Sequence, residues 1–284
     1  MIERLAAAVA ATRQGISASD TRSLSARGWD ALIASAGDLR PIDREAAESR
    51  ATELTSRGVQ VMCLADRTYP ARVRALSSPP PFLFCLGDLA LLETPGVAFS
   101  GSRNASGRAL IDAQEYARMT VALGRQVIAG NAKGVDLAAH VAALRSGGST
   151  TLVFSEGIEH LRKSGPVWRD EDGGERILIV SEFPPGQRWS AGSAMARNRT
   201  ILALAGVLLV IEAGSTGGTL DAGRRALRTG LPVAVVDAGG ETAPGSVALI
   251  SDGALALRTV DEFGDWVRQI DNPLEEQYQL RLDT

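Results

Sequence analysis

The residues of this 284-residue chain best suited to chemistry are two arginines and a glycine-rich turn. Arg197 and Arg199 lie in a predicted helix at 194–205, and the turn follows an apolar run at 206–211 that is typical of a buried parallel strand. The turn consists of Gly214, Ser215, Thr216, Gly217, Gly218 and Thr219. Glycines let a backbone approach a ligand closely, and the helix that begins near Thr219 offers free N–H groups and a positive dipole end. Together with the two guanidinium groups, this stretch is predicted to bind phosphate.

Two further turns follow predicted strands earlier in the chain, at 96–100 and 125–129. Their polar and glycine residues are Gly101, Ser102 and Arg103 in the first turn and Lys133 and Gly134 in the second. Ligands of open α/β sheets bind beyond the carboxyl ends of the strands. We therefore expect the three turns to converge on one crevice, with Asn198 contributed by the helix that carries the two arginines.

Asp136 and His140 are four residues apart on a predicted helix at 135–145, so they share a face and could form a hydrogen bond. Such a pair is more often structural than catalytic. A metal site would need further ligands, and His160 is the only other histidine, so no metal is expected.

Two glutamates, Glu182 and Glu212, stand at the ends of predicted strands. They could act as acid and base, or they could accept hydrogen bonds from a ribose or from Arg197 and Arg199. The anchoring role is favoured, because the sequence shows no persuasive nucleophile with a base and an orienting group. No catalytic residue is predicted.

The elements that must position these residues alternate as strand and helix from Gly96 onward. Strands are predicted at 96–100, 125–129, 150–154, 176–180, 206–211 and 232–236, and helices at 108–123, 135–145, 194–205, 219–229, 246–253 and 260–270. This alternation predicts an α/β fold with an extended Rossmann-like, doubly wound, mostly parallel sheet and right-handed crossovers. Neither G-x-G-x-x-G nor a P-loop follows the first of these strands, which weakens a dinucleotide-oxidoreductase interpretation.

The flanking regions suggest three parts. Residues 1–57 form a small helical region, with helices at 1–13, 28–36 and 41–57, that is either a structural cap or an interaction module. Residues 58–262 are predicted to form the main domain, with a strand pair at 58–93 that extends an edge of the sheet, and 263–284 form a C-terminal tail. Residues 157–175 are expected to form a helix with a mobile loop.

Composition restricts the function further. The formal charge of −3 gives no general attraction to nucleic acid, so any such binding must rest on a local basic patch. Cys63 and Cys85 lie in apolar runs and are expected to be buried free thiols. No apolar run is long enough to span a membrane, and the N-terminus lacks a signal-peptide pattern, so a cytoplasmic protein is expected.

Taken together, motifs between Gly58 and Thr259 resemble the DNA processing protein A (DprA/Smf) family. Each motif is weak alone, and their common order and spacing are specific. They are Tyr69-Pro70, Pro79-Pro80-Pro81-Phe82-Leu83-Phe84-Cys85-Leu86-Gly87-Asp88, Gly101-Ser102-Arg103, Gly134-Val135-Asp136-Leu137-Ala138-Ala139-His140, Ser181-Glu182-Phe183-Pro184-Pro185-Gly186, Arg197-Asn198-Arg199-Thr200-Ile201, Glu212-Ala213-Gly214-Ser215-Thr216-Gly217-Gly218-Thr219 and Leu249-Ile250-Ser251-Asp252-Gly253-Ala254.

The resemblance implies a non-catalytic homodimer that binds single-stranded DNA and loads the RecA recombinase on incoming strands in natural transformation, without a cofactor. By motif, the DNA contacts would be Gly101, Ser102, Arg103, Lys133, Arg197, Asn198 and Arg199, with residues 214–219 completing the pocket. The family usually has an aromatic residue just before Arg-Asn-Arg. Here residues 193–196 contain none, and Trp189 is the nearest.

Two other hypotheses remain open. The first is a nucleotide-binding sensor or enzyme on the same fold, because the glycine-rich turn is similar to that of lysine-decarboxylase-like phosphoribohydrolases. Gly218 and Thr219 match that turn, but Ala222 stands where those enzymes carry a glutamate, which argues against hydrolysis. The second is an interaction protein, in phage defence for example, that keeps the fold without the DNA site.

Overall fold

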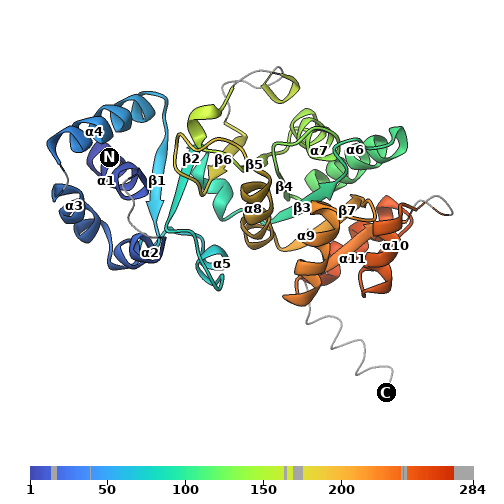
Figure 1. Cartoon of the computed structure of the whole chain (residues 1–284). Helices are drawn as coiled ribbons and strands as arrows, with labels where there is room; N and C mark the ends of the chain where they lie inside the picture. The colour runs from blue at the N-terminus through green and yellow to red at the C-terminus, as the bar shows by residue number, and fades with distance from the viewer. Residues whose placement is uncertain are drawn as a thin grey trace.

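A single mixed sheet runs through the chain in a computed structural model that describes residues 1–13, 18–38, 40–162, 165–168, 175–237, 239 and 242–271 (Figure 1). Within these residues nine strands are hydrogen-bonded in the order β1-β2-β6-β5-β4-β3-β7-β8-β9. The strands are β1 Gln60–Cys63, β2 Phe82–Gly87, β3 Gly96–Gly101, β4 Gln126–Ala129, β5 Thr150–Phe154, β6 Ile177–Ser181, β7 Val207–Glu212, β8 Val233–Val236 and β9 Leu255–Leu257.

Helices cover both faces of the sheet. They are α1 Ile2–Arg13, α2 Ala18–Arg27, α3 Trp29–Gly37, α4 Pro41–Ser56, α5 Ala71–Arg74, α6 Gly107–Ala122, α7 Val135–Arg145, α8 Ala191–Leu204, α9 Gly218–Arg228, α10 Pro244–Ser251 and α11 Val260–Asp271. Short 3₁₀ turns are η1 Leu89–Leu92, η2 Ile158–His160 and η3 Pro166–Trp168. Seven neighbouring strands of the sheet, β6-β5-β4-β3-β7-β8-β9, are parallel to one another, which confirms the predicted α/β class.

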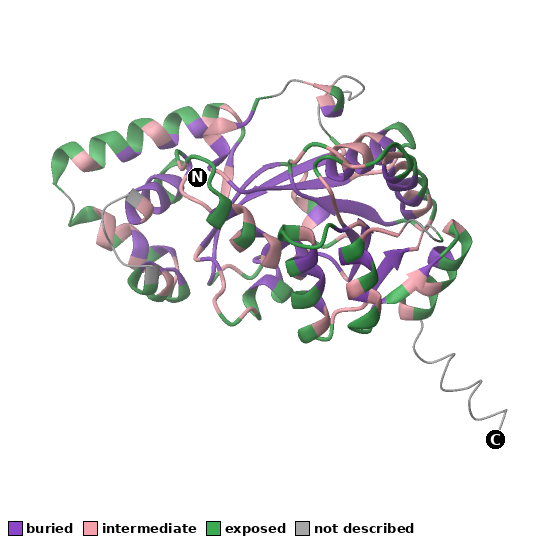
Figure 2. Cartoon of the chain, turned by 45° about the vertical axis from the view of Figure 1, so that its right-hand side comes forward, coloured by how far each residue is buried: buried purple, intermediate pink, exposed green. Residues whose placement is uncertain are grey.

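Alternate residues of each central strand face opposite helical layers, as the pleat requires. In β3, Val97 and Phe99 pack with α6, α7 and α11, whereas Ala98 packs with α8, α9 and α10. Because both faces are covered, the strands are buried along their length, and in Figure 2 they form a purple centre between partly green helices. This explains why they read as unbroken apolar runs.

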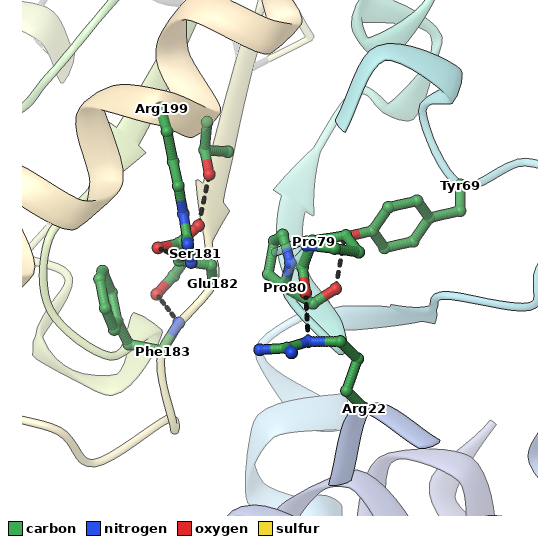
Figure 3. Close-up of polar contacts among 9 residues, drawn as sticks. Arg22, Tyr69, Pro79, Pro80, Ser181, Glu182, Phe183 and Arg199 are labelled. Carbon is green, nitrogen blue, oxygen red and sulfur yellow. Dashed lines mark hydrogen bonds and ion pairs between the residues drawn. The ribbon is translucent and has the colours of Figure 1, made fainter. Parts of the chain in front are cut away.

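The strand pair predicted at 58–93 extends the sheet edge, as expected. β1 pairs antiparallel with β2, and β2 pairs antiparallel with β6, where Cys85 lies opposite Val180. The extended lead-in to β2 is held in place because the Tyr69 hydroxyl donates to the Pro80 carbonyl over 2.7 Å, and Arg22 Nε donates to the Pro79 carbonyl over 3.2 Å (Figure 3). Both cysteines are buried free thiols, as predicted.

The N-terminal helices share a core with this extended edge. Leu5, Trp29 and Leu54 from α1, α3 and α4 pack in the same cluster as Phe82 and Phe84 of β2. The Trp29 ring stacks on Phe82 with the ring centroids 6.3 Å apart. The helical region therefore covers one face of the sheet extension.

The structure differs from the sequence expectations in three elements. The helix predicted at 157–175 is wrong for its described part, which contains only η2 and η3, and the predicted mobile loop lies largely outside the described residues. In the described part, the Gly157 N–H donates to the Gln187 carbonyl over 2.8 Å and the Glu159 N–H donates to the Pro185 carbonyl over 3.1 Å, which ties these residues to the loop before α8. Helix α2 and strand β9 were not predicted. The helix predicted at 260–270 is confirmed as α11, which buries Phe263 and Val267 and includes the described part of the tail predicted at 263–284.

Candidate nucleic-acid site

A cavity of about 510 Å³ opens at the carboxyl ends of the central strands. The turns that follow β3, β4 and β7 meet there, together with the first turns of α8 and α9. This is the convergence that a parallel sheet predicts for turns at its carboxyl edge. Ten of the residues singled out from the sequence line the cavity: Gly101, Ser102, Arg103, Asp136, Arg197, Asn198, Gly214, Thr216, Gly218 and Thr219.

The remaining predicted residues lie outside the described lining. They are Lys133, Gly134, His140, Glu182, Arg199, Glu212, Ser215 and Gly217. Lys133 is exposed on the turn after β4. Glu212 accepts a hydrogen bond over 3.3 Å from the backbone N–H of Ser106, the N-cap of α6, so its carboxylate joins two turns.

Arg197 is the unusual residue of the cavity because its guanidinium is buried without full hydrogen bonding. The side chain is 6% exposed, and within the described residues its Nε and Nη1 have no hydrogen-bond partner. Burial lowers the pKa of Arg197, and the charge of Asp136 opposes that shift. Buried donors of this kind carry a desolvation penalty that a bound anion would relieve.

Gly130, at the end of β4, makes the position of Arg197 possible. A Cβ atom on Gly130 would overlap Nη1 of the Arg197 guanidinium, so only glycine leaves room for it. Gly134 has a related role between two turns. Its φ of 78° lies in the left-handed region, and a Cβ atom there would overlap the Ser102 carbonyl. Gly134 therefore allows the β3 and β4 turns to pack closely. This structural role explains the glycine without the predicted contact to a ligand.

Trp189 supplies an aromatic ring to the cavity. The four residues directly before Arg197, at 193–196, contain no aromatic side chain. Trp189 is 50% exposed, and Arg103 lies over its ring with Cζ 5.6 Å from the ring centroid. Met195, 52% exposed, lines the same cavity. Neither residue was among the predicted contacts. The available signal was an aromatic residue in the polar loop that precedes α8.

Arg199 is absent from the described lining of the cavity and forms an ion pair with Glu182. Its Nη2 lies 3.3 Å from Glu182 Oε1, and the Thr200 hydroxyl donates to Glu182 Oε2 (Figure 3). Burial raises the pKa of Glu182, and its hydrogen bonds to Thr200 and Arg199 oppose that shift. The anchoring interpretation of Glu182 thus applies to Arg199, whereas no hydrogen bond between Glu182 and Arg197 occurs among the described residues.

The hydrogen bond predicted between Asp136 and His140 is wrong. The His140 ring bridges two other groups, with Nε2 2.7 Å from the Gly130 carbonyl and Nδ1 2.6 Å from the Thr150 hydroxyl. Asp136 accepts instead from the Ala132 N–H over 3.4 Å. Burial raises the pKa of Asp136 to about 6 and lowers that of His140 to about 4. Both ring nitrogens of His140 are therefore engaged by groups other than Asp136.

Helix α9 enters the cavity with its N-terminus. Gly217, with a φ of 107°, is its N-cap, and the Thr219 hydroxyl donates to the Gly101 carbonyl over 3.1 Å, which joins the β7 and β3 turns. Ala222 lines the cavity one turn further along. A methyl group therefore occupies the position at which a phosphoribohydrolase would carry its glutamate. Among the described residues, no group of three metal-ligating side chains occurs.

An open α/β sheet with a ligand-sized cavity at its carboxyl edge defines an extended Rossmann-like protein. The chain belongs to the DNA recombination-mediator protein A family, whose sequence profile matches residues 60–267. This confirms the resemblance found in the motifs. No helix in the described part of the chain is both long and apolar enough to cross a bilayer.

Individual relatives support the same assignment. The DNA processing protein DprA of Streptococcus pneumoniae is 33% identical over 194 residues, which are 67% of this chain and 65% of that protein. Protein Smf of Synechocystis is 32% identical over 159 residues, 55% of this chain and 40% of the relative. The chain thus spans less than two thirds of the length of these curated relatives.

Solved structures have the same fold. The crystal structure of the pneumococcal DprA superimposes with a TM-score of 0.66 at 26% identity, covering 85% of this chain and 84% of that one. DNA processing protein A of Helicobacter pylori gives a TM-score of 0.66 at 24% identity, covering 74% and 96%. The structural work on the latter concerns its mode of binding single-stranded DNA.

Proposed function

We propose that this recombination mediator binds single-stranded DNA in the cavity lined by Arg103, Trp189 and Arg197, without catalysing a reaction on it. The observation that carries the proposal is Arg197, which lines the open cavity while its buried Nε and Nη1 have no hydrogen-bond partner among the described residues. A phosphate in the cavity would offset the charge of this incompletely hydrogen-bonded guanidinium. The N-terminus of α9, which also reaches the cavity, favours the same negative charge.

The second part of the proposal concerns the bases. Trp189 is half exposed beside the phosphate-binding groups, and Arg103 lies over one face of its ring. Stacking of a base on an aromatic ring tolerates any base, so this arrangement supports binding without sequence preference. The binding energy would come from the local basic cavity, because the chain as a whole carries a net charge of −3.

By relation to its family, we also propose that the protein acts as a cytoplasmic homodimer and presents the bound strand to a RecA-type recombinase. Binding of single-stranded DNA is supported by the H. pylori relative, whose structural work concerns that activity. A role in recombination is supported by the name of the family. RecA contact and dimer formation each need their own test. Sedimentation of the purified chain and recombinase assembly on protein-coated single strands provide these tests.

Filter binding of labelled oligothymidylate to the whole chain at low salt tests the DNA proposal. Arg197→Gln and Arg103→Ala should each weaken retention at least tenfold, and the logarithm of the affinity should fall by about 0.7 per neutralised phosphate per log unit of salt. Arg225→Ala is the matched control, since Arg225 is exposed in the last turn of α9. Absent retention, or retention unchanged in Arg103→Ala, would refute the proposal. Calorimetry with AMP and ADP-ribose distinguishes a nucleotide-binding site from a DNA-binding site, because only the former should release heat with these small ligands.

A further inference from the structure

A second groove begins where the cavity ends. It has a volume of about 440 Å³, lies between α6 and α7, and is lined by residues that both helices turn outward. Arg103 and Asn104 line the groove as well as the cavity. The two depressions therefore adjoin at the turn after β3.

The described lining of this groove carries positive charge. Its described lining contains three guanidinium groups, on Arg103, Arg118 and Arg145, and no carboxylate. Arg118 and Arg145 are exposed, and the Gln114 amide lies 3.5 Å from Arg118 Nη2. In a chain whose net charge is −3, this is a local concentration of positive charge. It suits a polyanion better than a neutral or acidic partner.

The floor of the groove is apolar. Leu110 of α6 and Leu137 and Val141 of α7 are half-buried there, between the arginines of the two helices. An apolar floor with cationic edges matches a single strand, whose bases can lie on the floor while its phosphates meet the arginines. A duplex hides its bases and would leave the floor unused.

The length of the groove follows from helix geometry. Arg118 lies eleven residues after Gly107, where α6 begins, which corresponds to about 16 Å along the axis. Arg145 ends α7, about 15 Å from its start at Val135. At the stacked spacing of 3.4 Å per nucleotide of one strand, this distance corresponds to on the order of four nucleotides.

We propose that the α6–α7 groove is a second part of the DNA site, through which the strand leaves the cavity, with Arg118 and Arg145 contacting its phosphates. The proposal rests on the proposed function of the cavity. It predicts a site longer than the cavity, so the contribution of the groove depends on oligonucleotide length. Short strands are held by the cavity alone, and longer strands engage both parts.

Fluorescence anisotropy of the whole chain with oligothymidylates of about 5 and about 20 nucleotides tests this inference. In the double variant Arg118→Ala/Arg145→Ala, the long strand should bind five- to tenfold more weakly, and the short strand should bind as in the wild type. The salt slope for the long strand should decrease by about 1.4, the value for two lost phosphate contacts. The variant Arg118→Lys/Arg145→Lys should restore the slope, because point charges suffice for counterion release.

The matched control is Arg225→Ala/Arg228→Ala, which removes the same charge from the last turn of α9. Circular dichroism melts verify that each variant is folded. If the groove variant binds the long strand like wild type while Arg197→Gln does not, the groove proposal is wrong and the cavity proposal stands. An equal loss for both lengths would also overturn the groove proposal. If the wild type binds neither strand, both proposals fail.

Discussion

The guanidinium of Arg103 lies over the indole ring of Trp189, with Cζ 5.6 Å from the ring centroid. The two residues come from the turn after β3 and from the loop before α8, and they meet at the cavity. Trp189 thus places an aromatic ring in the site although residues 193–196, where the family usually has one, contain none. The cation over the ring also keeps positive charge next to a stacking surface.

Replacing this ring should weaken DNA binding through lost stacking. We expect Trp189→Ala to reduce the affinity for single strands by about 1–3 kcal/mol per stacked base, which is roughly five- to 150-fold. Trp189→Phe should retain most of the affinity, because the ring face persists. Anisotropy titration measures both values, and quenching of tryptophan fluorescence provides a second readout. Wild-type affinity in the alanine variant would exclude a stacking role.

Gly130 and Arg197 should behave as a coupled pair. Gly130→Ala places a Cβ atom on the position of Nη1 of Arg197, so the guanidinium has to move. We expect this variant to bind DNA as weakly as Arg197→Gln, and the double variant to be no weaker than either single one. A double-mutant cycle of affinities measures the coupling. Additive losses would show that Gly130 acts independently of Arg197.

Asp136 and His140 should contribute to the pH dependence of stability with opposite signs. The native pKa of Asp136 is raised from 3.8 to about 6, so native Asp136 keeps a proton that the unfolded chain loses, and its contribution to stability falls as the pH rises between these values. The native pKa of His140 is lowered from 6.5 to about 4, so its contribution rises over nearly the same range. The two slopes offset each other.

Asp136→Asn should remove one of these slopes. Relative to the wild type, its free energy of unfolding is expected to rise between pH 4 and pH 6 by on the order of 2–3 kcal/mol. Urea unfolding at several pH values measures the difference, in which the titration of all other groups cancels. Parallel profiles for variant and wild type would contradict the opposing contributions.

The Glu182–Arg199 pair should affect stability and leave DNA binding intact. Because the Glu182 carboxylate is buried and also accepts from Thr200, Glu182→Ala leaves Arg199 without its partner and should cost about 3 kcal/mol of unfolding free energy. The comparison is Arg224→Ala, which breaks an exposed 2.8 Å pair with Asp252 and should cost less than about 1 kcal/mol. Equal costs for the two variants, measured by denaturant unfolding, would show that burial is unimportant here.

The fold could be predicted from the sequence wherever apolar runs are long. The strands of the central sheet were located to within a residue or two because each is covered on both faces. Strand β9 was missed because Leu255–Leu257 is short and Leu255 is exposed at the sheet edge. Helix α2 was missed because its sequence is polar and the structure buries only Thr21 and Ser25 among its described side chains. Patterns of hydrophobicity carry no signal for such elements.

The site could be predicted in outline, because turns at the carboxyl ends of parallel strands must lie near one another. Its details depended on orientation. Arg197 and Arg199 are two positions apart on α8, and helix geometry sends such side chains in different directions, so both could not line one cavity. The position of Trp189 in the cavity could not be predicted, because it depends on the path of the loop before α8 and local sequence does not determine that path. Arg118 and Arg145 are far apart in the sequence, and they line one groove only because α6 and α7 pack side by side in the fold.

The antiparallel strand at the edge of the sheet has a consequence for the order in which the chain folds. Leu86 of β2 pairs with Ile179 of β6, so the apolar side chains that α1, α3 and α4 cover are complete only after β6 has been synthesised. Contacts between such distant segments slow folding, because a long loop has to close first. We therefore expect the N-terminal helices to dock late during synthesis, and their uncovered apolar faces to be the most chaperone-dependent part of the nascent chain.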